Sequence, residues 1–217
     1  MSNVIKLLNQ YWDNYLTDLH PKDRSMHILK ERQVEGMSCE NVRFLINLLV
    51  RTYAKDGIYL EIGIFRGCSL LSAALYNPST RCIGVDNFHL YNSDGKNEEI
   101  LKANLNKFSE VKNVEYYNMD YREAIRHLFS KEPNLKVNVY FYDGSHSFED
   151  ELEGLNMIVP HLAPKSVIIV DDLNYERVER AVNTFLNNNP TLKSVIKIKT
   201  EGNAETWWNG IEVIVKE

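Results

Sequence analysis

The chain has 217 residues, of which 44% are apolar and 25% charged, and its formal net charge is −5. This length fits one domain with a small appendage, and the apolar content is enough for a sizeable core. The acidic balance argues against a nucleic-acid partner, because binding the phosphate backbone needs a basic surface. No apolar run approaches the roughly 20 residues of a membrane helix, so we expect no membrane partner.

The N-terminus and the cysteines indicate a cytoplasmic protein. The first residues, MSNVIKLLNQYWDNY, carry charge early and lack the apolar core of a secretion signal. Cys39, Cys68 and Cys82 are odd in number, and no two of them form a CxxC pair. We therefore expect reduced thiols and neither disulfides nor a zinc site.

The first 55 residues are predicted to be helical. Apolar residues recur at helical spacing in two places: Val4, Leu8, Tyr11, Trp12 and Tyr15, and then Val42, Leu45, Leu48 and Leu49. Ser38 is the predicted N-cap of the second helix. We interpret residues 1–55 as an N-terminal helical segment that serves as a lid or an oligomer contact, since its apolar face favours a homo-oligomer.

From residue 56 onward, strand and helix patterns alternate. Strands are predicted at 57–63, 81–86, 113–119, 136–143 and 166–172. Helices are predicted at 68–76, 96–108, 121–129, 174–187 and after the capping pair Ser147 and Asp150. This alternation is typical of an α/β domain, here 56–217, with a mostly parallel sheet covered by helices on both faces. The last two strands, 192–199 and 210–217, have no helix between them, so they form a hairpin or one inserts antiparallel.

Ligands of such sheets bind beyond the carboxyl ends of the strands, where the first strand runs into a glycine-containing turn. Gly63 permits a tight turn, and Gly67 lets the next helix start close to a ligand. Asp86 ends the second strand, 23 residues after Gly63, where an acid accepts hydrogen bonds from ribose hydroxyls. A plain strand-to-helix turn and a solvated aspartate are the alternatives, and this pattern does not separate an adenosyl cofactor from NAD.

Acidic residues follow the next three strands as well. Asp120 could contact an adenine amino group or cap the helix at Tyr121. Asp143, Asp171 and Asp172 should lie at neighbouring strand ends, where crowded carboxylates need a proton or a cation between them. An all-oxygen ligand set suits a hard divalent cation such as Mg²⁺. The alternative is that Asp171 or Asp172 caps the following helix.

His146 and two tryptophans complete the candidate residues. His146 is a plausible general base because imidazole titrates near neutral pH, although it could simply pack locally. Trp207 and Trp208 could line a pocket or pack on the sheet edge. We expect the acceptor pocket to be shaped by the N-terminal helices and by the loops at 87–97 and 201–209.

Several of these motifs resemble known methyltransferase motifs. YLEIGIFRGCS resembles the E/D-x-G-x-x-x-G motif of class I methyltransferases, whereas the NAD fingerprint is G-x-G-x-x-G. GVDNF, YDGSHSFED and VDDL together resemble the macrocin O-methyltransferase and cephalosporin-hydroxylase-like family, over roughly residues 34–216. The final strand pair is similar to the antiparallel seventh strand of class I methyltransferases. The resemblance thus implies a seven-stranded Rossmann-like sheet with an N-terminal helical lid.

The resemblance also implies S-adenosylmethionine as cofactor, with Glu61 and Gly63 at its amino-acid end, Asp86 at the ribose and Asp120 near the adenine. It implies a Mg²⁺-type site, although the family often has Glu in place of Asp171. Residues 34–38 resemble a family segment that closes over the cofactor, so Gly36, Met37 and Ser38 are expected to cover it. The predicted cofactor-binding residues are Met37, Glu61, Gly63, Gly67, Ser69, Asp86, Asp120 and Asp143. The predicted metal ligands are Asp143, Asp171 and Asp172, and the predicted catalytic residues are His146 and Asp143.

These expectations describe an O-methyltransferase assisted by a divalent metal ion. A cation would chelate two neighbouring oxygens of a small acceptor, such as a sugar diol or a catechol, while His146 takes the proton. One alternative is an NAD-dependent oxidoreductase, which lacks support because Phe65 replaces the second glycine of its fingerprint. Another is an accessory protein that binds the cofactor or metal without transferring a methyl group.

Overall fold

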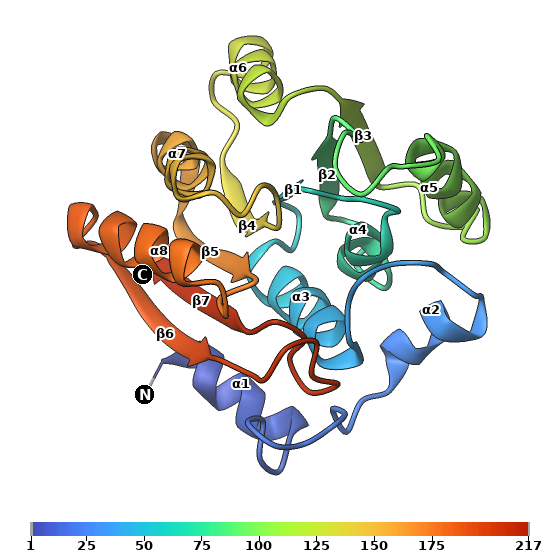
Figure 1. Cartoon of the computed structure of the whole chain (residues 1–217), viewed down its shortest axis with the longest axis horizontal. Helices are drawn as coiled ribbons and strands as arrows, with labels where there is room; N and C mark the ends of the chain where they lie inside the picture. The colour runs from blue at the N-terminus through green and yellow to red at the C-terminus, as the bar shows by residue number, and fades with distance from the viewer. Residues whose placement is uncertain (1, 217) are drawn as a thin grey trace.

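Seven strands form one sheet in a computed structural model of the chain, which describes residues 2–216 (Figure 1). The strands lie in the order β3-β2-β1-β4-β5-β7-β6. Their bounds are β1 Ile58–Ile62, β2 Arg81–Asp86, β3 Val114–Asn118, β4 Val137–Tyr142, β5 Leu162–Asp171, β6 Leu192–Ile198 and β7 Ile211–Lys216.

The first five strands are mutually parallel, and β7 runs antiparallel between β5 and β6. The first residue of β7, Ile211, pairs with Asp171 at the carboxyl end of β5. The connection from β6 therefore returns to the edge of the sheet where the parallel strands end. The predicted seven-stranded sheet with an antiparallel last strand is confirmed, and so is the absence of a helix before it.

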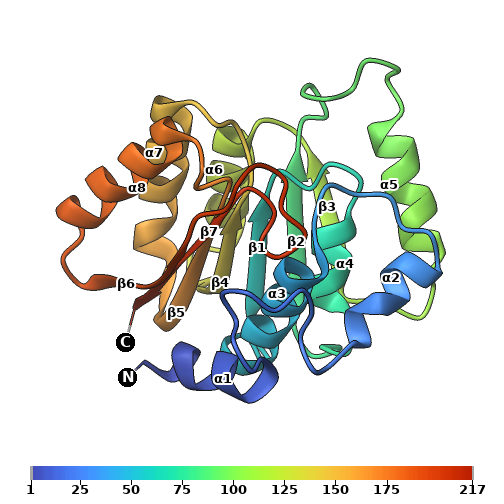
Figure 2. The same ribbon diagram turned by 60° about the horizontal axis from the view of Figure 1, so that its bottom comes forward.

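Helices cover both faces of the sheet, as predicted (Figure 2). One face packs against α1, α3, α4 and α5, and the other against α6, α7 and α8. The bounds are α1 Asn3–Tyr11, α2 Ile28–Glu31, α3 Glu40–Tyr53, α4 Cys68–Ala74, α5 Asn97–Asn106, α6 Tyr121–Lys131, α7 Phe148–Ile158 and α8 Glu176–Asn188. Short 3₁₀ turns lie at η1 Ser25–His27 and η2 Val159–His161.

The central strand β5 explains why the sequence there is almost uniformly apolar. Val167 and Ile169 belong to the core on the α3 side, whereas Ile168 and Val170 belong to the core on the α7 side. Successive side chains of a strand point to opposite faces, so a strand covered on both faces needs apolar residues at every position.

The first helix packs onto the main core of the protein. Val4, Leu8 and Trp12 are buried, and Trp12 Nε1 donates a hydrogen bond of 2.9 Å to Asn41 Oδ1. The apolar face that suggested an oligomer contact is thus covered by the chain itself, and a homo-oligomer stays a prediction. Helix α1 lies near the amino ends of the parallel strands, next to Asn138 and Pro164 (Figure 2). It therefore forms no lid over the opposite, carboxyl edge. The proposed domain boundary at residue 55 also stays a prediction.

The predicted helix starts from α3 to α8 are confirmed to within two residues, and one predicted cap is wrong. Asp120 caps α6 by accepting from the amide of Arg122, and Ser147 caps α7 by accepting from the amide of Asp150. Helix α3 begins one residue later than predicted, after Cys39, whose side chain makes no capping hydrogen bond. Ser38 is therefore not the N-cap. Across residues 2–216, no helix is both long enough and apolar enough to span a membrane.

Candidate functional site

A cavity of about 490 Å³ opens at the carboxyl ends of the parallel strands. Its size is in the range of small-molecule binding sites, and its place is the one expected for open α/β sheets. Each of the five parallel strands supplies a lining residue at or just after its end: Gly63, Asp86, Asp120, Asp143 and Asp172. The expectation that ligands bind beyond the carboxyl ends of the strands therefore predicted the position of this cavity correctly.

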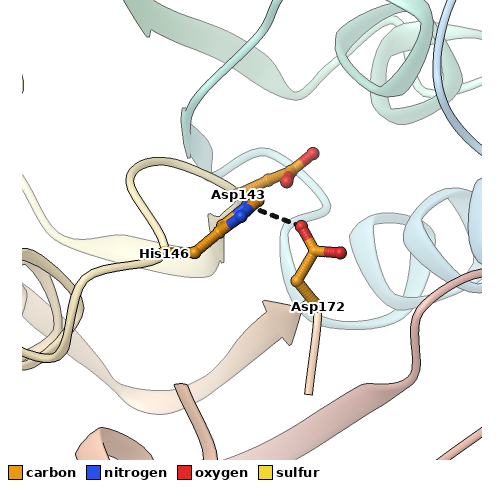
Figure 3. A group of neighbouring side chains, drawn as sticks. All are labelled: Asp143, His146 and Asp172. Carbon is orange, nitrogen blue, oxygen red and sulfur yellow. Dashed lines mark ion pairs between the residues drawn. The ribbon is translucent and has the colours of Figure 1, made fainter. Parts of the chain in front are cut away.

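Three side chains from two neighbouring strand ends converge in this cavity (Figure 3). Asp143, His146 and Asp172 each offer a ligand atom, and these atoms lie within 4.8 Å of one another. His146 Nε2 is 2.6 Å from Asp172 Oδ2. The other carboxylate oxygen of Asp172 is buried and has no hydrogen-bond partner. A buried carboxylate oxygen without a partner is costly in the absence of a cation or a proton.

Asp171 differs from its predicted place in this cluster. Among residues 2–216, the side chains whose potential ligand atoms lie close enough to share a metal ion are those of Asp143, His146 and Asp172. His146 therefore takes the place that was predicted for Asp171. One carboxylate oxygen of Asp171 accepts a hydrogen bond of 3.0 Å from the backbone amide of Asp172. The predicted alternative of helix capping is also wrong for both aspartates, because α8 begins only after Tyr175.

The carboxylates in and next to the cavity raise one another's pKa values. Burial raises the pKa of Asp143 well above its usual range, and the nearby charges of Asp171 and Asp172 raise it further. Burial and the charge of Asp172 likewise raise the pKa of Asp171. Burial also raises the pKa of Glu151, with contributions from Asp172 and Asp171. Such a concentration of negative charge is unfavourable until a proton or a cation offsets it.

A tyrosine ring stacks on the histidine of this group. The rings of Tyr175 and His146 stack with centroids 5.1 Å apart and planes 20° from parallel. The backbone amide of Tyr175 donates to the carbonyl of Asp172 at 3.0 Å, and Asp172 itself has a positive φ of 58°. This turn brings Tyr175 back over the pair formed by His146 and Asp172. No sequence pattern predicted the role of Tyr175, because only the turn geometry places it there.

Gly63 allows the turn after β1 to approach the backbone of Asp143 closely. Its φ is +89°, and a Cβ added at this position would lie 1.8 Å from the carbonyl oxygen of Asp143. Both the backbone conformation and the close contact therefore require glycine. The tight turn predicted at Gly63 is present, and it lines the cavity.

The side chain of Asp86 bonds to two loops, the turn after β1 and the loop that follows β2. Its Oδ2 accepts from the amide of Phe65 at 2.8 Å, and its Oδ1 accepts from the amide of Phe88 at 2.7 Å. Burial nevertheless raises its pKa above the usual value, because desolvation exceeds the effect of these bonds. Asp86 lines the cavity, and its contact with a ribose stays a prediction.

Glu61 and Gly67 do not line the cavity, contrary to the expectation for cofactor-binding residues. Glu61 is fully buried and accepts hydrogen bonds from Ser69 Oγ and from Tyr59 Oη, the latter at 2.8 Å. Gly67, with φ +81°, lies before α4 and packs against Leu101. Ser69 lines a small neighbouring cavity, and Glu61 is separated from that cavity by Ser69. Their roles toward a cofactor stay predictions.

The buried Glu61 makes a testable contribution to the pH dependence of stability. Burial raises its pKa from 4.5 to about 8. Folded Glu61 therefore keeps a proton that the unfolded chain releases, so its contribution to the free energy of unfolding falls as the pH rises from about 4.5 to 8. We expect Glu61→Gln to gain stability relative to wild type across this range. Urea unfolding at several pH values measures the difference, with the exposed Glu99→Gln as a control that should show no such trend.

The remaining predicted residues lie around the cavity. Met37 lines both the main cavity and the small one, while Gly36 and Ser38 line the small one. Trp207 and Trp208 were predicted either to line a pocket or to pack on the sheet edge. Trp208 lines the main cavity, whereas Trp207 is buried and donates to the carbonyl of Tyr15 at 2.6 Å. The loops predicted to shape the pocket contribute lining residues, namely Asn87, His89, Leu90, Tyr91, Asn203, Trp208 and Asn209.

Solved structures with the same fold are numerous, although their sequences are distant. The O-methyltransferase TomG from Streptomyces achromogenes, solved with SAM, has a TM-score of 0.67 at 15% identity, covering 100% of this chain and 99% of that one. An O-methyltransferase from Bacillus cereus, solved with SAH, has a TM-score of 0.65 at 13% identity over 98% and 97% of the two chains. The SAH-bound methyltransferase PaMTH1 from Podospora anserina has a TM-score of 0.59 at 13% identity over 88% and 87%. At these identities the likeness shows a shared fold.

The sequence itself carries the family assignment. No curated protein matches the chain. A family model described as a methyltransferase domain matches residues 60–173, from β1 to just beyond the end of β5. This region is more than half of the chain and contains the glycine turn and the group of Asp143, His146 and Asp172. The chain therefore belongs to this methyltransferase-domain family.

Proposed function

We propose that the protein is an S-adenosylmethionine-dependent O-methyltransferase assisted by a divalent cation and acting on a hydroxyl of a small molecule. The observation that carries the proposal is the convergence of Asp143, His146 and Asp172 in the cavity at the carboxyl ends of the strands. The family assignment removes the oxidoreductase and accessory-protein alternatives. The narrower resemblance to macrocin O-methyltransferases stays part of this proposal.

The site that we propose for the cofactor is the half of the cavity formed by the first three strands. Asp86 would accept hydrogen bonds from ribose hydroxyls, and Asp120 would face the adenine while capping α6. Gly63, Met37 and Ser69 would surround the amino-acid end, where the small cavity adjoins the main one. TomG and the Bacillus cereus enzyme, which share this fold, were solved with SAM and SAH respectively.

The donor set fits a divalent cation. Asp143 and Asp172 would bind it through carboxylate oxygens, and the buried, unpartnered Oδ1 of Asp172 is an atom that such an ion would satisfy. Carboxylates alone suit Mg²⁺, whereas an added imidazole moves the preference toward Mn²⁺ or another transition metal. S-Adenosylmethionine supplies an electrophilic methyl group, and the cation lowers the pKa of a hydroxyl that it chelates.

His146 is our proposed general base, with a second possible role as a ligand. If the hydrogen on Nε2 is donated to Asp172, Nδ1 is left free to take the proton of the acceptor hydroxyl. Asp172 would then fix the tautomer, and the stacked Tyr175 would hold the ring plane. If Nε2 binds the cation instead, His146 contributes to metal affinity and leaves proton removal to another group.

The surroundings of the cavity favour a flat, catechol-like acceptor over a sugar diol. Tyr175 and Trp208, which follow β5 and precede β7, line the cavity outside its cofactor half, and neither is buried. Aromatic side chains beside a polar centre are typical of a pocket that binds an aromatic ligand. The two neighbouring hydroxyls of a catechol would face the carboxylates, while its ring would contact these side chains.

Release of S-adenosylhomocysteine in the presence of S-adenosylmethionine and catechol tests the proposal. We expect turnover that EDTA abolishes and that added Mn²⁺ or Mg²⁺ restores. Activity that persists after complete metal removal would exclude the metal role. No turnover with any diol or catechol would exclude these two acceptor classes, and failure to bind S-adenosylmethionine would exclude the transferase proposal.

Replacement of the histidine separates its two roles. We expect His146→Ala to lower kcat by a factor of about 10² to 10⁴, the usual effect of removing a general base. Excess Mn²⁺ should leave this loss unchanged, whereas recovery at high metal concentration would identify His146 as a ligand. His127→Ala is the matched control, because His127 lies on α6 and does not line the cavity.

A further inference from the structure

A strap of residues 33–38 joins α2 to α3 and passes close to α4 (Figures 1 and 2). Met37 in this strap lines both cavities and is 44% exposed. The strap contains no helix or strand, so its position depends on contacts with neighbouring elements.

One buried asparagine on α5 joins the strap to the glycine turn. Asn104, only 1% exposed, donates from Nδ2 to the carbonyl of Arg66 at 2.9 Å and to the carbonyl of Glu35 at 3.3 Å. Arg66 belongs to the turn after β1, and Glu35 is two residues from Met37. The Oδ1 atom of Asn104 accepts from Lys107 Nζ at 3.1 Å, and the same Nζ donates to the carbonyl of Gln33 at 2.5 Å.

Two further contacts hold the strap against the turn. Arg66 pairs with the side chain of Glu35 at 2.5 Å. Gly36 lies so close to α4 that an added Cβ would be 2.3 Å from the Cβ of Cys68. The strap therefore packs directly on the first residue of the helix that follows the glycine turn.

We propose that Asn104 is a positioning residue that fastens the strap to the glycine turn and thereby sets the affinity for S-adenosylmethionine. This inference rests on the proposed function, because it assigns the cavity under Met37 to that cofactor. Asn104 lines neither cavity, so it acts through Arg66 and Glu35 and has no contact with the ligand. A buried amide that bonds two loops at once fixes their separation, and its loss frees both.

Asn104→Asp tests the inference, because it keeps the side-chain shape and removes both donors. We expect S-adenosylhomocysteine binding, measured by calorimetry, to weaken about tenfold. Hydrogen exchange of the strap amides in the absence of ligand should become faster. Gly36→Ala is a second variant, which pushes the strap away from Cys68 without touching Asn104, and it should weaken binding in the same way.

Asn113→Asp is the matched control. Asn113 also donates from one amide to two backbone carbonyls, of Asn77 at 2.9 Å and Thr80 at 2.8 Å, but near the amino ends of the strands. Binding weakened in Asn104→Asp no more than in Asn113→Asp would overturn the inference, and so would unchanged hydrogen exchange in the strap. A wild-type protein that binds no S-adenosylhomocysteine would instead refute the proposed function, while the exchange measurement would still decide whether Asn104 holds the strap.

Discussion

Gly63→Ala is expected to lower the free energy of unfolding by about 3 kcal/mol or more and to abolish methyl transfer. The backbone of Gly63 has φ +89°, a conformation that costs a residue with a side chain about 1 to 3 kcal/mol. The new methyl group would also lie 1.8 Å from the carbonyl oxygen of Asp143, and relieving such overpacking costs about 1 to 3 kcal/mol. The backbone that carries Asp143 must move to make room. Urea unfolding and methyl transfer to catechol measure the two effects.

Gly202→Ala isolates the conformational part of this effect. Gly202 has φ +59°, and a Cβ added there would meet no heavy atom within 4 Å. We expect this control to lose about 1 kcal/mol of the free energy of unfolding, and only stability is compared because Gly202 lies in the connection beside the cavity. Equal losses of stability in the two variants would mean that the contact between Gly63 and Asp143 is unimportant.

Asp172→Asn is expected to lower kcat by about three orders of magnitude. The substitution keeps the size of the side chain, and asparagine tolerates the positive φ of 58° at this position. It removes the charge that pairs with His146 and that would bind the cation. A bound metal ion contributes several kcal/mol to transition-state stabilisation, and each 1.4 kcal/mol or so corresponds to a factor of ten in rate. Steady-state kinetics at saturating metal measures the loss.

Asp171→Asn distinguishes the metal ligands that we propose from the geometry from those expected from the sequence. Asparagine at position 171 can still accept the hydrogen bond from the amide of residue 172. Because Asp171 lies outside the converging group, we expect its variant to stay within about tenfold of wild type. A loss as large as that of Asp172→Asn would restore Asp171 as a metal ligand and contradict the assignment of His146.

The sheet was predictable because each of its strands leaves a local signal. The run from Ser166 to Asp171 is apolar at nearly every position because both faces of β5 are covered. The missing helix between the last two strands predicted an antiparallel partner, since a parallel crossover needs a longer connection. The positions of Asp86, Asp120 and Asp143 at the cavity were predictable for the same reason, because each ends a strand or follows one within two residues.

The side-chain directions within the site were not predictable. Two adjacent aspartates follow the apolar run of β5, but the sequence does not tell which of them faces His146. The positive φ of Asp172 directs its side chain toward His146. Backbone angles of this kind have no reliable sequence signal outside glycine. Tyr175 and Asn104 were missed because their partners are distant in sequence or come together only through loop geometry.

The antiparallel course of β7 determines where acceptor selectivity can change. Ile198 and Ile211 pair at the end of the β6–β7 ladder, so the connecting residues 199–210 begin and end at fixed points beside the cavity. Replacement or lengthening of this connection would leave both strands in register, and it would alter the wall formed by Asn203, Trp208 and Asn209. The cofactor half of the cavity draws on other strands. A lineage could therefore exchange one acceptor for another through this single hairpin loop while its methyl-donor chemistry remains the same.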